Sequence, residues 1–357
     1  MSLDQLSPPR ALTLRVPFGV RRLVSARLAL RPMLVCALLL VLTAVVVLLA
    51  LMLGKIVYSP GEVLATLRGL GTPQQELFIL DYRLPQAVAG PAFGAMLGVA
   101  GALFQTITRN PLGSPDIIGF TAGSSAGGVA VVALVGSSHY LVAGGALLGG
   151  AVVAVLVMLL SRGGGVAGFR LIIAGIALSA MLTSIETWIV LTADLQLAQI
   201  AALWGAGSLN GAHFSYLLPP MLVGLGTVLL AVIFLSRRLD LVEMGDDASS
   251  ALGMSPASTR LLAVAAGVVL VAMVTAAAGP IAFVALAAPH IGRRLAASSG
   301  AALLPAACAG AFLLASADLA AQHAIPGHTY PVGVVTVAVG GLYLIALLIN
   351  QNRKAAV

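Results

Sequence analysis

The sequence predicts an all-α membrane protein with about ten transmembrane helices and with both termini in the cytoplasm. Three observations lead to this fold class. Of the 357 residues, 60% are hydrophobic and only 9% are charged, and the mean hydropathy is +1.06. The apolar residues fall in repeated runs, many of them near the roughly 20 residues that cross the hydrocarbon core of a bilayer. Most basic residues lie on alternate connections between these runs, as in polytopic helical proteins.

Ten apolar segments follow one another along the chain. The first comes after a basic N-terminal segment, residues 1–32, and no small-x-small cleavage site follows it, so we expect an uncleaved span rather than a signal peptide. The connection 192–215 holds Trp204 beside a glycine-rich turn and predicts a short interfacial helix. The eighth segment is short and opens at Gly279-Pro280, which predicts a broken or half helix. The expected spans are residues 33–53, 85–107, 117–135, 141–160, 171–191, 216–235, 261–278, 280–292, 303–322 and 331–349.

The positions of the basic residues orient this predicted bundle. If ten spans alternate, 16 of the 19 Lys and Arg residues fall on the side of the N-terminus. Only Lys55, Arg68 and Arg83 fall on the other side. Because cytoplasmic connections carry the basic excess, the sequence predicts a cytoplasmic segment 1–32, a transmembrane domain 33–350 and a cytoplasmic tail 351–357. Glycines four residues apart, such as Gly90 and Gly94, predict close helix packing within one bundle rather than a dimer face.

Recognised catalytic motifs are missing from the sequence. It has no Walker A motif, no G-x-S-x-G, and no His and Cys cluster with metal-ligand spacing. We therefore expect no enzymatic activity and no metal or cofactor bound by this chain. For His290 a structural role is favoured over catalysis. Cys36 and Cys308 fall inside apolar runs and are expected to be packed thiols.

The predicted spans are almost free of ionisable residues. Glu186 and Asp318 are the exceptions, both in the outer halves of their spans. For Asp318, a structural hydrogen-bonding role is favoured over a role in the lumen. Proton-coupled carriers usually place ionisable groups near the middle of the membrane. Energy for any transport is therefore expected to come from another protein.

One connection, residues 237–260, collects charge. It holds four of the 12 acidic residues and three of the 19 basic residues. Apolar residues recur at roughly helical spacing between the acidic ones, and Gly245 and Gly253 are natural breaks, so the pattern predicts two short amphipathic helices joined by a turn. The pattern alone is equally consistent with a docking element and with a solvated loop.

Several motifs, in order along about residues 55–350, resemble the permease subunits of iron–siderophore and cobalamin ABC importers. Within that family the likeness is to the ferric enterobactin permease subunits in particular. The motifs are Arg83-Leu84-Pro85, the run Arg109-Asn110-Pro111-Leu112-Gly113-Ser114-Pro115-Asp116, Leu203-Trp204-Gly205-Ala206-Gly207, Glu243-Met244-Gly245-Asp246-Asp247, Ala251-Leu252-Gly253, Gly279-Pro280-Ile281-Ala282-Phe283, Ala288-Pro289-His290-Ile291-Gly292 and Pro331-Val332-Gly333.

The resemblance implies a type II ABC importer permease fold in the bacterial cytoplasmic membrane. It implies a second permease subunit, with a heterodimer favoured, two cytoplasmic ATPase subunits that bind ATP and Mg²⁺, and an extracytoplasmic siderophore-binding protein. It also implies that residues 240–258 form coupling helices that contact the ATPase. The implied contact residues are Asp240, Glu243, Met244, Gly245, Asp246, Asp247, Ala251, Leu252 and Gly253.

Two further groups of residues take roles from the resemblance. A cytoplasmic gate is implied at Asn110, Leu112, Gly168 and Phe169. Docking of the binding protein is implied for Arg83, together with Arg68 or Lys55. Gln86 stands where a second arginine is common in the family, and Gln322 where a third can occur. Docking is therefore expected to rely on Arg83 with Arg68 or Lys55, or on the other permease subunit.

The expected function is that of a permease subunit for ATP-driven import of a ferric siderophore, with an enterobactin-like catecholate favoured. Cobalamin or haem is the alternative cargo within the same family. A stand-alone secondary transporter is the alternative from a different class, and the scarcity of ionisable groups in the spans argues against a proton-coupled one.

Overall fold

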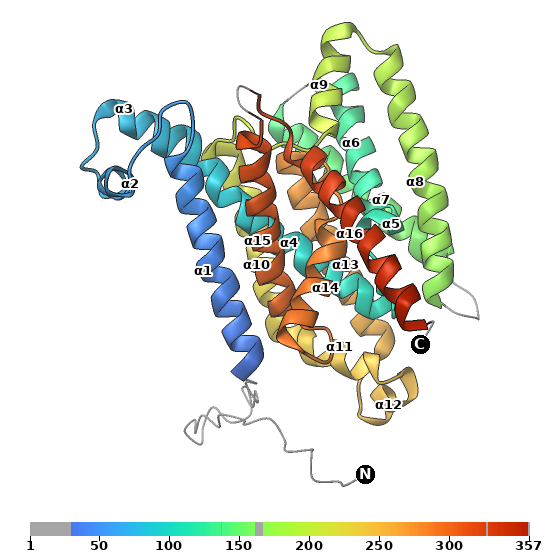
Figure 1. The fold of residues 1–357 in the computed structure, drawn as a ribbon. Coiled ribbons are helices and arrows are strands. Elements are labelled where there is room, and N and C mark those ends of the chain that lie inside the picture. The colour runs from blue at the N-terminus through green and yellow to red at the C-terminus, as the bar shows by residue number, and fades with distance from the viewer. Residues whose placement is uncertain (1–29, 137, 161–166, 326–327, 356–357) are drawn as a thin grey trace.

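The computed structural model describes residues 30–136, 138–160, 167–325 and 328–355. All regular elements in these residues are helices (Figure 1). Nearly all of the predicted N-terminal segment, residues 1–32, lies outside the described residues, because the first helix begins at Leu30.

Seven helical stretches of the described chain are long and apolar enough to cross a membrane. Two of them are continued by π-helical turns, η2 (Leu77–Arg83) and η3 (Ala231–Leu235). Five of the seven are single helices: α1 (Leu30–Met52), α7 (His139–Leu160), α8 (Ala167–Thr192), α13 (Pro256–Ala278) and α15 (Leu303–His323). In the other two, α3 (Pro73–Glu76) continues through η2 into α4 (Leu84–Thr108), and α10 (Phe214–Leu230) continues through η3 into α11 (Ser236–Glu243).

Three other helices match the remaining predicted spans. They are α6 (Phe120–Leu134), α14 (Val284–Ala296) and α16 (Val332–Ala355), whose apolar part is Val332–Tyr343. The prediction of a short eighth element is confirmed, since α14 has 13 residues. It begins at Val284 rather than at Gly279-Pro280, because Gly279, with φ 75°, ends the helical path after α13 and Phe283, with φ 68°, directly precedes α14. Each predicted span therefore coincides with a helix, although the number that cross a bilayer stays a prediction. The predicted tail from residue 351 begins inside α16.

The core forms around α4, which α15 covers along much of its length. Of the 25 residues of α4, 20 are buried. Gly94 of α4 lies against the backbone of Gly310 in α15, and a side chain at either position would overlap the other helix. Gly127 of α6 and Gly145 of α7 make the same kind of approach. The prediction that the glycine pairs pack helices within one bundle is confirmed.

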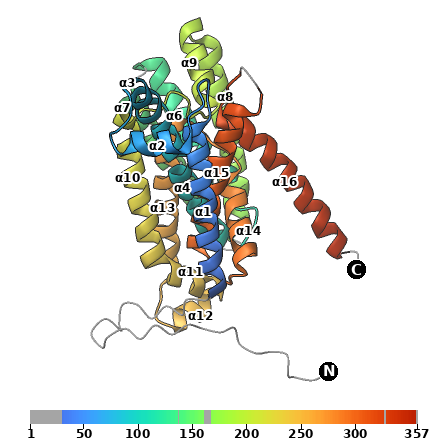
Figure 2. The ribbon, with the colours of Figure 1, turned by 60° about the vertical axis from the view of Figure 1, so that its left-hand side comes forward.

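The two ends of the bundle carry different short helices. The α2 end carries α2 (Pro60–Leu67), α3 and α9 (Leu195–Gly205), and the α12 end carries α11, α12 (Asp246–Ala251), the start of α1 and the end of α16 (Figure 1). Both described chain termini thus lie at one end, as an even number of crossings requires. Figure 2 shows α16 leaning away from the bundle, which leaves much of its surface uncovered by this chain.

Two local predictions can be compared with this packing. Cys36 and Cys308 are buried free thiols in one apolar cluster between α1 and α15, which confirms that they pack rather than form a disulfide. The connection 192–215 does contain a short helix, α9. The ring of Trp204 lies on Gly128 of α6, so this tryptophan helps to dock α9 onto the bundle.

Candidate functional site

The charged connection folds as two short helices, as its pattern predicts. Helix α11 ends at Glu243, and α12 begins at Asp246 after Gly245, whose φ of 119° is a conformation open mainly to glycine. Leu239 and Val242 are 0% exposed and anchor α11 on the bundle. In α12 the buried residue is the polar Ser249. The second helix therefore has no fully buried apolar side chain that fastens it to the bundle.

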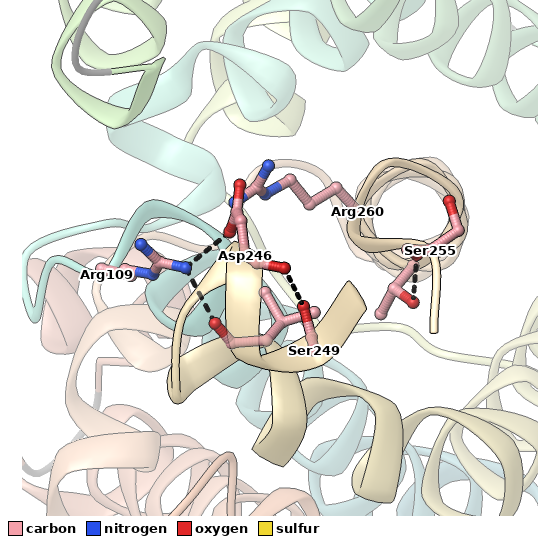
Figure 3. A network of polar contacts seen from close by, with 7 residues as sticks. Arg109, Asp246, Ser249, Ser255 and Arg260 are labelled. Carbon is pink, nitrogen blue, oxygen red and sulfur yellow. Dashed lines mark hydrogen bonds and ion pairs between the residues drawn. The ribbon is translucent and has the colours of Figure 1, made fainter. Parts of the chain in front are cut away.

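A carboxylate that joins three helices holds α12 in place (Figure 3). Asp246 Oδ1 accepts hydrogen bonds from Arg109 Nη2 at 2.7 Å and from Arg260 Nη2 at 2.6 Å. Arg109 follows the last residue of α4, and Arg260 lies near the start of α13. The same Nη2 of Arg109 donates to the carbonyl oxygen of Val242 in α11 at 2.8 Å. We call Arg109, Asp246 and Arg260 the arginine–aspartate node.

The two arginines keep Asp246 ionised. The hydrogen bond from Arg260, helped by the charges of both arginines, holds the pKa of the Asp246 carboxyl below its ordinary value. A depressed pKa means that the node stabilises the fold at any pH above the ordinary range of aspartate and loses this effect as the pH falls through the lowered value. The node is therefore fully formed at neutral pH. Because its side chains are 32–46% exposed, water screens it and each pair contributes little to stability.

Two other acidic residues of the connection also bind their own chain. Asp240 Oδ1 accepts from the backbone N–H of Ala301, in the loop before α15, at 3.0 Å. Glu243 Oε1 accepts from Thr106 Oγ1 of α4 at 3.2 Å. Together with the node, these contacts tie the connection to α4, α13 and the start of α15.

Five of the other predicted contact residues are exposed on the surface. Met244 is 69% exposed and Leu252 is 63% exposed, which is unusual for large apolar side chains on a charged connection. Asp247 is exposed as well. We call the exposed residues Met244, Asp247, Ala251, Leu252 and Gly253 the tip surface. The predicted ATPase-contacting set therefore divides into residues that anchor the connection and residues that are free to meet a partner.

The segment implied as a gate directly follows the node. Asn110 Oδ1 accepts from the N–H of Leu112 at 2.9 Å, which closes a tight turn, and Leu112 is 41% exposed. The Pro111 carbonyl oxygen lies 2.9 Å from His290 Nε2 of α14. Since a carbonyl only accepts, Nε2 carries the proton, and this contact supports the structural role of His290. Gly168 and Phe169 lie in the first turn of α8, and the contacts of the Phe169 side chain are outside the described part of the chain.

The sequence assigned no role to three of the residues that build this end of the bundle, although Arg109 and Asp116 stand in a family motif. Arg109 and Arg260 form the node, and Asp116 joins the start of α5 (Pro115–Ile118) to α14. Asp116 Oδ2 accepts from the N–H of Phe283 at 3.2 Å, and its Oδ1 accepts from Thr121 Oγ1 at 2.6 Å. One signal could have pointed to the node, namely an arginine at the end of an apolar run on the basic side of the predicted topology: Arg109 follows the second expected span, and Arg260 precedes the seventh.

At the α2 end, Arg83 has partners within its own chain. Its Nη1 donates to the carbonyl of Leu51 at 2.8 Å, and its Nη2 donates to that of Ile56 at 2.7 Å. Its guanidinium lies over the ring of Tyr58, 5.1 Å from the centroid. The last carbonyls of a helix lack helical partners and attract cations, so Arg83 caps the C-terminus of α1. Lys55 and Arg68 are exposed, and binding-protein docking stays a prediction for all three.

Replacing Arg83 with methionine is expected to lower the free energy of unfolding by about 1–3 kcal/mol, because the carbonyls at the end of α1 lose hydrogen bonds from a charged donor. The same change at Arg68, an exposed residue that follows α2, is expected to leave stability within about 0.5 kcal/mol of the wild type. Thermal unfolding of both variants in detergent measures the difference. Equal stability of the two variants would show that Arg83 does not hold α1.

The two glutamines at this end bind a buried carboxylate. Asp318 is 4% exposed and accepts from Gln86 Nε2 at 3.0 Å and from Gln322 Nε2 at 2.7 Å. Gln86 Nε2 also lies 3.1 Å from Asn210 Oδ1, in the connection after α9. These contacts join α4 and α15 and support the structural role expected for Asp318. The glutamine side chains are thus engaged inside the molecule.

The arrangement of apolar helices defines a polytopic helical membrane protein with a polar, firmly anchored connection at one end. The model of the FecCD transport family matches residues 41–350. The chain belongs to this family, and it is a multi-pass protein of the bacterial inner membrane.

Relatives and a solved structure agree with this assignment. The chain is 44% identical to the ferric enterobactin transport system permease protein FepG of Escherichia coli (strain K12), over 91% of this chain and 98% of FepG. It is 35% identical to the ferric enterobactin permease protein FepD of the same organism, over 89% of this chain and 96% of FepD. A metal-chelate type ABC transporter in an inward-facing conformation superimposes with a TM-score of 0.76, at 26% identity, over 89% of this chain and 99% of the other.

Proposed function

We propose that this chain is the membrane-spanning permease subunit of an ATP-driven importer that moves a ferric siderophore across the inner membrane. The observation that carries the proposal is the connection made by α11 and α12. It is anchored to the bundle through Asp240, Glu243 and Asp246, while it exposes Met244 and Leu252. Exposed apolar side chains on a polar surface are typical of a protein–protein contact. The proposed partner is a cytoplasmic ATPase subunit.

In this proposal the chain supplies the path and the partner supplies the energy. ATP and Mg²⁺ bind to two ATPase subunits, and the movement of these subunits reaches the bundle through α11 and α12. The described residues hold no cluster of His, Cys, Asp and Glu that suits a metal ion. The α12 end is then cytoplasmic, in agreement with the basic excess on that side of the predicted topology.

A catecholate cargo and a heterodimeric permease extend the proposal. FepG and FepD are two different permease proteins named for ferric enterobactin transport, and this chain is more similar to FepG (44%) than to FepD (35%). We therefore propose a second, FepD-like permease as the partner of this chain. An extracytoplasmic binding protein delivers the ferric siderophore to the α2 end.

Reconstitution tests this function. The chain is purified from its native membrane with the subunits that accompany it and is placed in liposomes with the ATPase side outward and the binding protein inside. Export of radiolabelled ferric enterobactin from the vesicle interior is expected to require external ATP. Cobalamin, haem and a ferric hydroxamate are the matched alternative cargoes. Transport that depends on a proton gradient without ATP would instead support a secondary transporter, and transport of cobalamin or haem alone would reject the siderophore.

A further inference from the structure

We infer that the arginine–aspartate node passes the movement of the docked ATPase from α12 to the turn after α4, with Arg109, Asp246 and Arg260 as positioning residues. This inference rests on the proposed function. It goes beyond docking, because the side chains of the node bind one another and the carbonyl of Val242 within this chain. It assigns to three half-exposed side chains a role in the efficiency of transport rather than in assembly.

Helix α12 is weakly attached to the bundle. It has six residues, and its buried residue is Ser249, whose Oγ donates to the carbonyl of Asp246 at 3.0 Å. Apolar burial, which normally holds a short helix on a bundle, is lacking here. The two hydrogen bonds to Asp246 Oδ1 are therefore the charged contacts that set the position of α12 on α4 and α13. A displacement of α12 acts first on these contacts.

The backbone at Arg109 couples the node to the end of α4. Its φ of 49° is left-handed, a conformation that costs a non-glycine residue about 1–2 kcal/mol. Its N–H bonds to the last turn of α4, while its guanidinium bonds to Asp246 and to Val242. The side chain and the left-handed backbone are thus held by different helices. Movement of α12 relative to α4 pulls on the residue at which α4 ends.

The residues directly after Arg109 connect the node to α14. They form the turn that the hydrogen bond between Asn110 and Leu112 closes. The Pro111 carbonyl in this turn contacts His290 of α14, and Asp116 a few residues later contacts Phe283 before α14. The node is therefore adjacent to a segment that touches another helix of the bundle at two points. A change at α12 can reach α4, α13 and α14 without passing through the apolar core.

The ion pairs of the node are weak enough to break and re-form when α12 moves. Half-exposed ion pairs typically contribute about 0–1 kcal/mol each, so neutralising Asp246 is expected to leave the bundle folded. A weak link that joins several helices can break and re-form as the partner moves. This separates the inferred role from a purely structural one, in which loss of the node would lower stability and transport together.

The experiment compares four variants in the reconstituted importer. Asp246→Asn and Arg260→Gln remove the charge of the node, and Arg260→Lys keeps a cation that can reach Asp246. Asp194→Asn neutralises an exposed carboxylate directly before α9, at the other end of the bundle, to which no role is assigned. Siderophore transported per ATP hydrolysed is measured together with the amount of ATPase that co-purifies. We expect Asp246→Asn and Arg260→Gln to lower this ratio about fivefold or more with the ATPase still bound. Arg260→Lys is expected to recover most of the ratio, and Asp194→Asn to leave it unchanged.

The other outcomes overturn the inference in distinguishable ways. An unchanged ratio in Asp246→Asn and Arg260→Gln, in vesicles whose wild type is active, rejects the inferred role of the node and leaves the proposed function unaffected. Loss of the ATPase from these variants shows that the node only shapes the docking surface, which also rejects the inference. If one charge-removing variant does not fold, the other one and the Arg260→Lys comparison decide. Wild-type vesicles that transport no siderophore reject the proposed function and the inference with it.

Discussion

Replacing Gly94 of α4 with valine is expected to prevent the native bundle from forming, and replacing it with alanine is expected to destabilise the bundle by about 1–3 kcal/mol. A Cβ at this position would overlap the carbonyl group of Gly310 in α15. Neither helix can yield easily, because α4 is the most enclosed of the long apolar helices in the described residues. Glycine here allows two backbones to touch, which is how helices associate where lipid removes the hydrophobic driving force.

The matched control is Gly226 in α10, where a Cβ would meet no atom within 4 Å. Alanine has the higher helix propensity, so Gly226→Ala is expected to be neutral or to stabilise the protein by up to about 1 kcal/mol. The same substitution thus has opposite signs at two helical glycines. Unfolding in detergent with increasing denaturant measures both changes. A Gly94→Ala variant as stable as Gly226→Ala would contradict the close packing of α4 and α15.

The sequence predicted the helices well for a physical reason. A span must satisfy its backbone within one helix and cover about 30 Å of hydrocarbon, so length and hydropathy alone locate it. The two short helices of the connection 237–260 were also predictable, because Gly245 and the spacing of apolar residues are local signals. Glycine spacing predicted close packing as well. It could not show that Gly94 meets Gly310, since that depends on which helices become neighbours.

Side-chain partners could not be predicted in the same way. Asp246 and Asp247 are adjacent and chemically identical, yet one is bound by two arginines and the other is exposed. Arg83 binds carbonyls at the end of α1, and Gln86 reaches Asp318 in α15. These contacts join residues from 14 to 232 positions apart in the chain. Residue type and local spacing give no information about such distant pairs, which is why residues predicted for partners proved to hold the molecule together.

The same division between bound and exposed residues predicts a large effect at the tip surface. Replacing Met244 and Leu252 together with aspartate is expected to weaken ATPase binding at least about a hundredfold. Burial of one such apolar side chain contributes roughly 1.5–3 kcal/mol, and an unpaired carboxylate in the contact adds a desolvation cost. Because both side chains are exposed, the permease itself is expected to fold normally. Co-purification of the ATPase and its affinity in detergent are the measurements.

The control is Leu70→Asp at the α2 end, a change of the same chemistry at a leucine that is 77% exposed. It is expected to leave ATPase binding unchanged, because it lies on the far side of the bundle. The tip variant and the node variants then separate two steps: the former loses the ATPase, whereas Asp246→Asn keeps the ATPase and loses efficiency. Retained ATPase affinity in the Met244 and Leu252 double variant would show that the partner binds elsewhere on the α12 end, and the exposed apolar residues would need another explanation.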